Sequence, residues 1–370
     1  MKVSEICEYA PKSNIKAGDA CDGGKYVFFT SSADESKRYN DYQNEGEGII
    51  MGTGGNATLH YYDGKYAVST DCVVLLPNEQ IRCKYLYYFF LGNMRILEEG
   101  FKGAGLKHTN KGYIGGIDIG DIPPFEKQDK IIEMFDSLRS IIDLRTDEIE
   151  KLDELIKARF VELFGDAREN PKGFDMVPFI DIVEYMGDIG SNGANKVVVD
   201  HLDMKDEEDY ALMVRFTNFT KNDFSEDVKF ISKEAYDFFK KSQIFGGELI
   251  ICKIGSAGQN YVMPYLNRPV SLGLNQIMVR VTDNVLMPYL YQYLHTDYGE
   301  FLISGCINGA VTKTITKTEL KKIPVMMPPM ELQQQFADFI KQVDKSKVAV
   351  QKALDETQLL FDSLMQEYFG

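Results

Sequence analysis

The sequence lacks several features that would place it in a common functional class. No run approaches the roughly 18 apolar residues of a membrane-spanning helix, and the N-terminal residues MKVSEICEYAPKS contain no apolar core of a signal peptide. The six cysteines show neither CxxC nor Cys–His spacing, so neither a zinc site nor a disulfide framework is indicated. These absences favour a reduced, cytoplasmic setting without a membrane.

Motifs for catalysis and for cofactor binding are also missing. There is no GxxxxGK[ST] loop and no GxSxG, and the four histidines lack metal-ligand spacing. The segment Gly52–Gly55 falls short of GxGxxG, which predicts a tight turn. Ile122-Pro123-Pro124-Phe125 is similar to the Asp/Asn-Pro-Pro-aromatic motif of amino-methyltransferases, but the Ile122 side chain has no hydrogen-bonding group. We therefore expect no catalytic residue, no metal and no cofactor bound by this chain.

Positive charge is in short supply. The chain of 370 residues carries 41 Lys and Arg against 56 Asp and Glu, a net charge of −15. A protein that binds nucleic acid by itself is normally basic. A role on nucleic acid therefore requires that the acidity be segregated, or that a basic partner cover it.

What the chain does contain is a long internal repeat at an offset of 205 residues. Pro123–Gln128 aligns with Pro328–Gln333, and the register then holds without a gap until Glu162–Gly165 meets Glu367–Gly370. This period is far longer than that of a solenoid repeat. Paired prolines suit the start of a helix but not its interior. The repeat therefore predicts two long helices, over 127–164 and 332–369.

Within each copy, residues at alternating spacings of three and four form two rows. Such heptads are typical of coiled coils, and a chain with only two of these helices is expected to pair them antiparallel. Arg145, Arg159 and Lys347 interrupt the rows and are expected to cost stability while fixing the register. The rows are Ile131, Leu138, Arg145, Leu152, Arg159 and Phe135, Ile142, Ile149, Ile156, Leu163, then Phe336, Val343, Val350, Thr357, Leu364 and Ile340, Lys347, Leu354, Phe361, Tyr368.

The segments before the two helices predict globular modules. Short runs rich in Val, Ile, Tyr and Phe alternate with Gly, Asn and Asp, which indicates strands and turns, with helices near 84–96 and 288–301. The two modules have weak sequence similarity to each other, for example in Tyr85-Leu86-Tyr87 and Tyr289-Leu290-Tyr291. The prediction is an α+β chain with pseudo-two-fold organisation: two mostly-β modules joined and separated by two long antiparallel coiled-coil helices. The expected boundaries are 1–120 for the first module, 121–165 for the central helix, 166–322 for the second module and 323–370 for the C-terminal helix.

Donor-rich polar segments are the candidate binding surfaces. Lys and Arg neutralise phosphates, whereas Asn, Gln and Arg read base edges in the major groove. Both modules place a basic segment just before their long helix. Each residue alone is equally consistent with an ordinary solvated side chain. The candidate phosphate contacts are Lys107, Lys111, Lys313 and Lys317, the candidate base readers are Arg215, Asn218, Gln259 and Asn260, and His108, Asn110, Lys221, Ser256 and Thr314 accompany them.

Taken together, these segments resemble a known family. Ile323–Gln333, with its first copy Pro123–Gln128, is similar to the Ile-Pro and Pro-Pro-x-x-Glu-Gln stretch of specificity subunits of bacterial type I restriction-modification enzymes. Gly309–Leu320 and Gly255–Gly258 support the resemblance. It implies two target-recognition domains, each reading one half of a split, asymmetric double-stranded DNA site, and paired helices that set the gap. It also implies docking of methyltransferase subunits, which bind S-adenosylmethionine, and of motor-nuclease subunits.

The chain departs from the family pattern at the residue before each glutamine of the repeated motif. Lys127 before Gln128 and Leu332 before Gln333 replace a glutamate. Any contact made through that carboxylate is therefore in doubt. Three other interpretations remain open: the recognition subunit of a related two-subunit restriction system, a coiled-coil scaffold whose modules bind proteins, and a methyltransferase acting alone.

Overall fold

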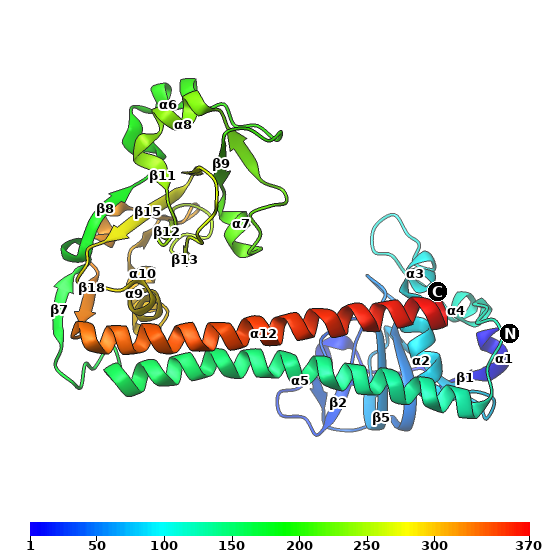
Figure 1. Cartoon of the computed structure of the whole chain (residues 1–370). Coiled ribbons are helices and arrows are strands. Elements are labelled where there is room, and N and C mark those ends of the chain that lie inside the picture. Colours follow the sequence, from blue (N-terminus) through cyan, green and yellow to red (C-terminus); the bar gives the residue numbers. More distant parts are fainter. The chain divides into compact units, whose positions relative to one another are not determined.

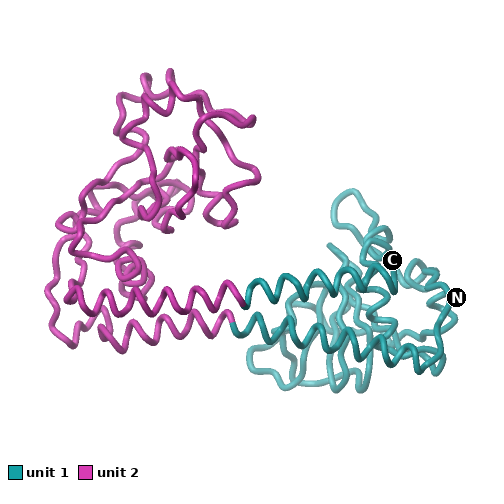
Figure 2. Tube along the Cα trace, viewed as in Figure 1, with its two compact units in different colours: residues 1–148, 350–370 teal, residues 149–349 magenta.

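The computed structural model describes residues 1–370 and divides into two compact units (Figure 2). Unit 1 contains residues 1–148 and 350–370, and unit 2 contains residues 149–349. Two helices of 40 residues each, α5 (Phe125–Phe164) and α12 (Met330–Phe369), contribute to both units and are packed together (Figure 1). Each begins directly after its proline pair. The prediction of an α+β chain with two β-sheet domains and two long paired helices is confirmed.

Unit 1 is built on one six-stranded sheet in the order β1-β6-β4-β5-β2-β3. All neighbouring strands are antiparallel except β2 and β5, which are parallel. The strands are β1 (Cys7–Tyr9), β2 (Tyr26–Phe29), β3 (Arg38–Tyr39), β4 (Asn44–Gly52), β5 (Leu59–Val68) and β6 (Cys72–Pro77). The short helices are α1 (Val3–Ile6), η1 (Ala17–Asp19), α2 (Cys83–Gly92), α3 (Met94–Glu99) and α4 (Lys111–Gly116).

Unit 2 contains two four-stranded sheets, in the orders β13-β12-β15-β8 and β10-β9-β14-β11, and two small strand pairs, β7 with β18 and β16 with β17. Its strands are β7 (Asp175–Pro178), β8 (Val183–Gly187), β9 (Ala211–Val214), β10 (Lys229–Ile231), β11 (Gln243–Ile244), β12 (Leu249–Cys252), β13 (Asn260–Val262), β14 (Val270–Leu272), β15 (Gln276–Val281), β16 (Ile307–Asn308), β17 (Thr314–Ile315) and β18 (Pro324–Met327). Its short helices are η2 (Phe179–Ile182), η3 (Ile189–Asn192), α6 (Asn195–His201), α7 (Phe216–Thr220), α8 (Lys233–Phe238), η4 (Lys240–Ser242), α9 (Met287–Leu294), α10 (Asp297–Gly305) and α11 (Lys317–Leu320).

The two units share one strand arrangement. The order β1-β6-β4-β5 in unit 1 corresponds to β8-β15-β12-β13 in unit 2, and the parallel pair β2–β5 corresponds to the parallel pair β9–β14. The register agrees, because Ile50 lies opposite Val74 and Ile250 lies opposite Met278. The long strands β4 and β5 of unit 1 are each divided in unit 2, into β11 and β12 and into β13 and β14. The second module is thus the first one with its sheet broken in two.

Aromatic side chains hold each module to its own part of the helix pair. In unit 1, the buried Phe135 ring lies 5.3 Å from that of Phe361 and 5.0 Å from that of Tyr88 on α2. In unit 2, the Phe160 ring lies 5.5 Å from that of Phe336. The partner on α12 moves toward its N-terminus as the residue on α5 moves toward its C-terminus, so the two helices are antiparallel.

The polar positions on the helix rows do form contacts. Lys347 on α12 donates to Asp153 on α5 at 2.7 Å. The Arg159 guanidinium lies 5.6 Å from the centre of the Phe339 ring. Lys347 and Arg159 thus contact the other helix, whereas Arg145 pairs with Glu148 of its own helix. That these residues fix the register stays a prediction.

One predicted row position is wrong. Tyr368 is 37% exposed, whereas Phe369 beside it is 8% exposed. The reason is that the end of α12 packs on the module as well as on α5. The Phe369 ring lies 5.3 Å from that of Tyr85, and Asn93 Nδ2 donates to the Phe369 carbonyl at 2.7 Å.

The glutamine of each repeated motif has the same structural role in both units. Gln128 Oε1 accepts from Arg82 N at 2.8 Å, and its Nε2 donates to the Pro123 carbonyl at 2.8 Å. Gln333 Oε1 accepts from Leu286 N at 2.9 Å, and its Nε2 donates to the Pro328 carbonyl at 2.9 Å. Arg82 and Leu286 are the N-cap residues of α2 and α9. Each glutamine therefore ties the start of a module helix to the start of a long helix.

Gln333→Leu is expected to lower the free energy of unfolding by about 1–3 kcal/mol, because it leaves the Leu286 amide and the Pro328 carbonyl without their partner in a buried place. Gln334→Leu is the matched control: Gln334 is the next residue of α12, is exposed, and bonds only Asp338 of its own helix. Urea unfolding of both variants measures the difference. Equal stabilities of the two variants would contradict this role for Gln333.

Candidate nucleic-acid interface

In each unit, a loop after a central strand meets a polar segment that precedes the long helix. In unit 1, the loop after β4 meets residues 102–109: Gly54 forms a bridge with His108, and Thr109 N donates to the Thr53 carbonyl at 3.0 Å. The segment Gly52–Gly55, predicted as a tight turn, thus forms part of a larger loop surface.

Unit 2 repeats this arrangement with the loop after β12. Ile254 forms a bridge with Thr314, and Ile315 N donates to the Lys253 carbonyl at 3.0 Å. Thr53 and Lys253 also correspond in a second bond, since their amides donate to the carbonyls of Asp71 and Asn275. We call the two meeting segments of each unit its loop pair: 53–56 with 102–111 in unit 1, and 253–260 with 307–317 in unit 2.

Most candidate residues of unit 1 present their side chains to solvent. Lys107, His108 and Lys111 are exposed, and Lys111 Nζ lies 4.7 Å from the centre of the Tyr9 ring. Asn110 is exposed as well, but its Oδ1 accepts from Tyr113 N at 3.0 Å and caps α4. The structure therefore brings these four residues together at one end of the loop pair.

In unit 2, the loop pair contains six of the candidates. Ser256, Gln259 and Lys313 are exposed, and Thr314 is half-buried. Asn260 is only 6% exposed. Its Nδ2 donates to the Gly258 carbonyl at 3.2 Å, while its Oδ1 has no partner. Asn260 is the first residue of β13, and its side chain bonds within the loop; its role as a base reader stays a prediction.

The candidates near α7 are largely engaged within the module. Asn218 is 2% exposed, and its Oδ1 accepts from Arg215 N at 2.8 Å, which caps the helix. The Arg215 guanidinium donates to the carbonyl and the carboxylate of Asp227, and Lys221 Nζ lies 3.4 Å from the same carboxylate. Because the Asn218 side chain is engaged within the module, its role as a base reader stays a prediction. Asn218, a polar residue between aromatic ones, caps the helix in this structure.

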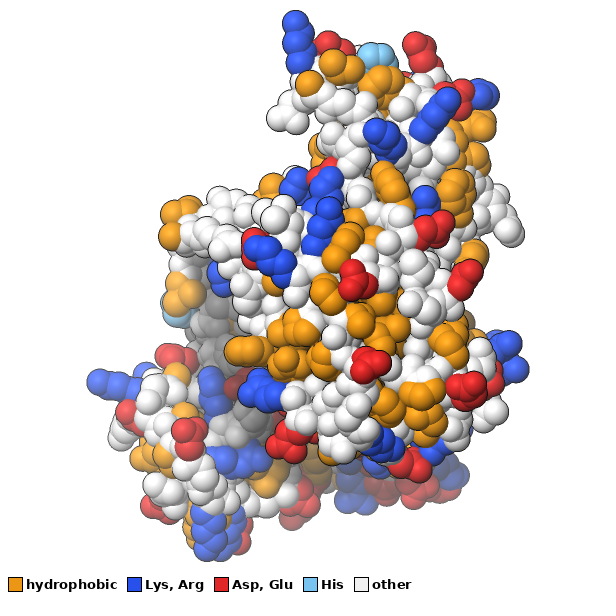
Figure 3. Space-filling model, turned by 90° about the vertical axis from the view of Figure 1, so that its left-hand side faces the viewer, with side chains coloured by type: hydrophobic (Ala, Val, Ile, Leu, Met, Phe, Trp, Pro, Cys, Tyr) orange, Lys and Arg blue, Asp and Glu red, His pale blue; other side chains and the backbone are white.

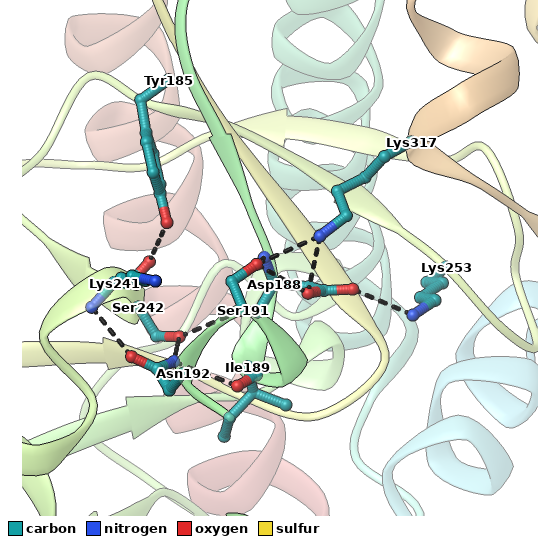
Figure 4. Close-up of polar contacts among 9 residues, drawn as sticks. All are labelled: Tyr185, Asp188, Ile189, Ser191, Asn192, Lys241, Ser242, Lys253 and Lys317. Atoms are coloured by element: carbon teal, nitrogen blue, oxygen red, sulfur yellow. Dashed lines mark hydrogen bonds and ion pairs between the residues drawn. The ribbon is translucent and has the colours of Figure 1, made fainter. Parts of the chain in front are cut away.

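Lys317 is likewise not a free cation. Its Nζ donates to Asp188 Oδ1 at 2.9 Å and to Ser191 Oγ at 3.0 Å, and Lys253 Nζ donates to Asp188 Oδ2 at 3.0 Å (Figure 4). Burial alone would raise the pKa of Asp188, but the hydrogen bonds from Lys317, Lys253 and Ser191 outweigh it and lower the pKa to about 2. In this structure the Lys317 ammonium is thus paired with a carboxylate, and its role as a phosphate contact stays a prediction.

Asp188 and Lys253 were missed in the sequence. A signal for Lys253 existed, because Ile50 and Gly55 recur as Ile250 and Gly255 around it. For Asp188 there was none: it follows β8, far in sequence from both lysines, and only the folded sheet brings the three together.

The surface is mixed in character. Both long helices carry more carboxylates than lysines and arginines, so part of the net acidity lies outside the modules. The face drawn in Figure 3 has a broad area of hydrophobic side chains with both basic and acidic groups among and beside them. No cluster of three or more metal-ligating side chains is present, and no helix is long and apolar enough to cross a membrane.

Residues 1–154 and 186–357 match the family model described as the type I restriction modification DNA specificity domain. The chain is similar to the specificity subunit of the type I restriction enzyme MjaVIII from Methanocaldococcus jannaschii, with 20% identity over 343 residues, 84% of this chain and 76% of the relative. It is also similar to the EcoDI specificity subunit from Escherichia coli, with 24% identity over 143 residues, 39% of this chain and only 32% of that relative.

Solved structures show the same fold. The S subunit of a type I restriction-modification system from M. genitalium aligns over 100% of this chain and 95% of its own, with a TM-score of 0.65 and 13% identity. A chain from a structure on complex assembly and conformational transition of the type I R-M system aligns over 100% of this chain and 96% of its own, with a TM-score of 0.53 and 16% identity.

Proposed function

The chain belongs to the type I restriction-modification DNA specificity subunits, a non-catalytic class, and from this premise we propose that it reads a bipartite, asymmetric DNA site within a cytoplasmic complex. Residues 1–120 and 166–322 are the two target-recognition domains. Residues 121–165 and 323–370, which contain α5 and α12, connect them and set the gap between the half-sites.

The observation that carries this proposal is the pair of equivalent loop pairs with different side chains. The same backbone contacts hold Thr53 against Thr109 in unit 1 and Lys253 against Ile315 in unit 2. The exposed groups differ: Lys107 and His108 lie in one loop pair, and Ser256 and Gln259 in the other. One scaffold with two sets of donors suits two readers of unlike half-sites, since phosphate contacts position a protein and base contacts specify the sequence.

The helices are the proposed docking surface for methyltransferase subunits, with motor-nuclease subunits joining the assembly. Several large apolar side chains on α5 and α12 face solvent, including Leu144 at 64%, Val348 at 70% and Leu359 at 71% exposed. In unit 2, a groove of about 640 Å³ runs beside Pro288, Ile340 and Val348. A basic partner on these helices would also offset their carboxylates, which meets the objection raised by the net charge.

Exchanging residues 1–118 for the equivalent module of a relative should change one half-site of the methylated sequence and leave the other and the gap unchanged. The donor module must keep Tyr85 and Tyr88, because their rings pack on Phe369 and Phe135. Methylome sequencing of the host with each version reads the result.

The reciprocal exchange of residues 166–322 is the matched control and should change only the other half-site. Changes in both half-sites after either exchange, or in neither, would refute independent readers. Methyl transfer by the purified chain alone would instead favour a methyltransferase.

A further inference from the structure

Unit 1 contains a pocket whose lining includes two lysines. Of the candidate residues, only Asn110 and Lys111 lie on this lining. The pocket has a volume of about 290 Å³ and lies where the end of β1, the loop after β4 and the start of α4 meet. Lys12 and Lys111 lie on its lining together with Thr53, Thr70 and Thr109. Both lysines are exposed residues, and neither has a carboxylate partner, in contrast to Lys317. No aspartate or glutamate lines the pocket.

In unit 2, the position that corresponds to this pocket is occupied by the side chain of Asp188. Ala10 N donates to the Val74 carbonyl, and Gly187 lies opposite Met278 in the corresponding register, so Asp188 occupies the position of Pro11. Residues Thr53 and Lys111 of the pocket lining correspond to Lys253 and Lys317. These are the two lysines that the Asp188 carboxylate bridges. An anion thus occupies this place in unit 2, and it is supplied by the chain itself.

The contrast between the units indicates the chemical class of ligand that suits the unit 1 pocket. Both sites share the backbone frame and a lysine directly after the N-cap residue of a short helix, Asn110–Lys111 and Thr316–Lys317. Unit 2 has a second lysine, Lys253, and its own carboxylate, whereas unit 1 has Lys12, the Thr109 hydroxyl, which has no partner, and no carboxylate. A site with two ammonium groups and a hydroxyl donor suits a compact oxyanion, because charge-assisted hydrogen bonds to such a group are the strong ones.

We propose that the unit 1 pocket binds one backbone phosphate of the DNA, held between Lys12 and Lys111 in the place that the Asp188 carboxylate takes in unit 2. This rests on the proposed function. It adds a residue that the sequence did not indicate, Lys12, and an asymmetry: the first module anchors the duplex through this pocket, and the second does not.

The test uses the full chain in complex with its methyltransferase subunits and a duplex carrying the methylated site. Lys12→Ala and Lys111→Ala should each weaken binding. The double variant should flatten the plot of log affinity against log salt by about 0.9, the contribution of one phosphate, rather than by twice that amount. Lys25→Ala, which removes an exposed lysine of unit 1 outside the pocket, the loop pair and the long helices, should leave the slope unchanged. Unchanged thermal midpoints confirm that the variants are folded.

A scan with single neutral methylphosphonate linkages locates the phosphate. One linkage in one half-site should cost the wild-type complex as much affinity as the double substitution does, and should cost the double variant nothing further. A uniform loss at all linkages would show only diffuse attraction and overturn the proposal. So would a double variant that binds like wild type at every salt concentration.

Adding inorganic phosphate tests whether the pocket binds a free anion rather than DNA. If it raises the thermal midpoint of the wild type and not of the double variant, while DNA binding is the same for both, the pocket is an anion site and its assignment to DNA is wrong. If the wild-type complex shows no sequence-specific binding, the proposed function itself fails, and this proposal with it.

Discussion

Phe336→Ala is expected to lower the free energy of unfolding by about 3–5 kcal/mol, the range for removing a buried phenylalanine side chain. Phe336 on α12 is fully buried, and its ring lies 5.5 Å from those of Phe160 and Phe164 on α5. Alanine would leave a cavity where the helix pair and the second module share one core. Such a core closes only partially around a void, since its backbone is held on several sides.

Urea unfolding followed by circular dichroism measures this loss. Leu359→Ala is the control, because Leu359 lies on the same helix and is 71% exposed. Surface changes of this kind usually stay within about 0.5 kcal/mol. Equal midpoints for the two variants would mean that Phe336 does not pack against α5. A variant that loses only one of two unfolding transitions would show that the units unfold separately.

The helix pair was predictable because its signal is local. A heptad row needs only the residues of one helix, and the gapless repeat gave the same rows twice. The buried residues among the predicted row positions are Ile131, Phe135, Ile156, Leu163, Phe336, Val343, Val350 and Phe361. Prediction failed at the end of α12, where Phe369 rather than Tyr368 is buried. There the helix also meets Tyr85 and Asn93, and a periodic pattern contains no information on such contacts.

The modules were predictable in class but not in detail. Strand composition and the weak echo between modules indicated two related mostly-β folds. The break of the second sheet could not be foreseen, because it depends on where β11 ends and β12 begins across the turn at Gly246 and Gly247, both with positive φ. A register shift between Arg280 and Val281 also displaces β8 relative to its counterpart.

The candidate contact residues fall into two groups: those that are exposed and those whose side chains bond to other groups of the chain. Lys107, Lys111 and Lys313 remain exposed, as a sequence rich in glycine and lysine suggests. Asn218 and Lys317 are instead engaged by the fold, one as a helix cap and the other by Asp188. Residue type indicates what a side chain can donate, but only long-range packing decides whether another group of the chain already accepts it. The base-reading assignments of Arg215 and Gln259 stay predictions.

Inserting four residues after Glu148 in α5, together with four after Ala349 in α12, should change the gap of the recognised site and preserve both half-sites. Both insertions lie at the boundary between the two units, so neither module core is touched. Four helical residues add about 6 Å and turn the helix about 40° beyond a full turn, a change comparable to one or two base pairs of duplex. Matching the insertions keeps the antiparallel contacts on each side in register, including Lys347–Asp153.

Affinity for the original site should then fall toward that for non-specific DNA, by about 10³-fold or more, because the two domains can no longer engage both half-sites at once. Methylome sequencing should find the same half-sites separated by a longer gap. Four residues inserted after Glu207, an exposed position outside the helices, provide the control and should leave the gap unaltered. If the variant with insertions in both α5 and α12 preserves the original gap, the length of these helices does not set the gap. The spacing must then come from the partners that dock on them.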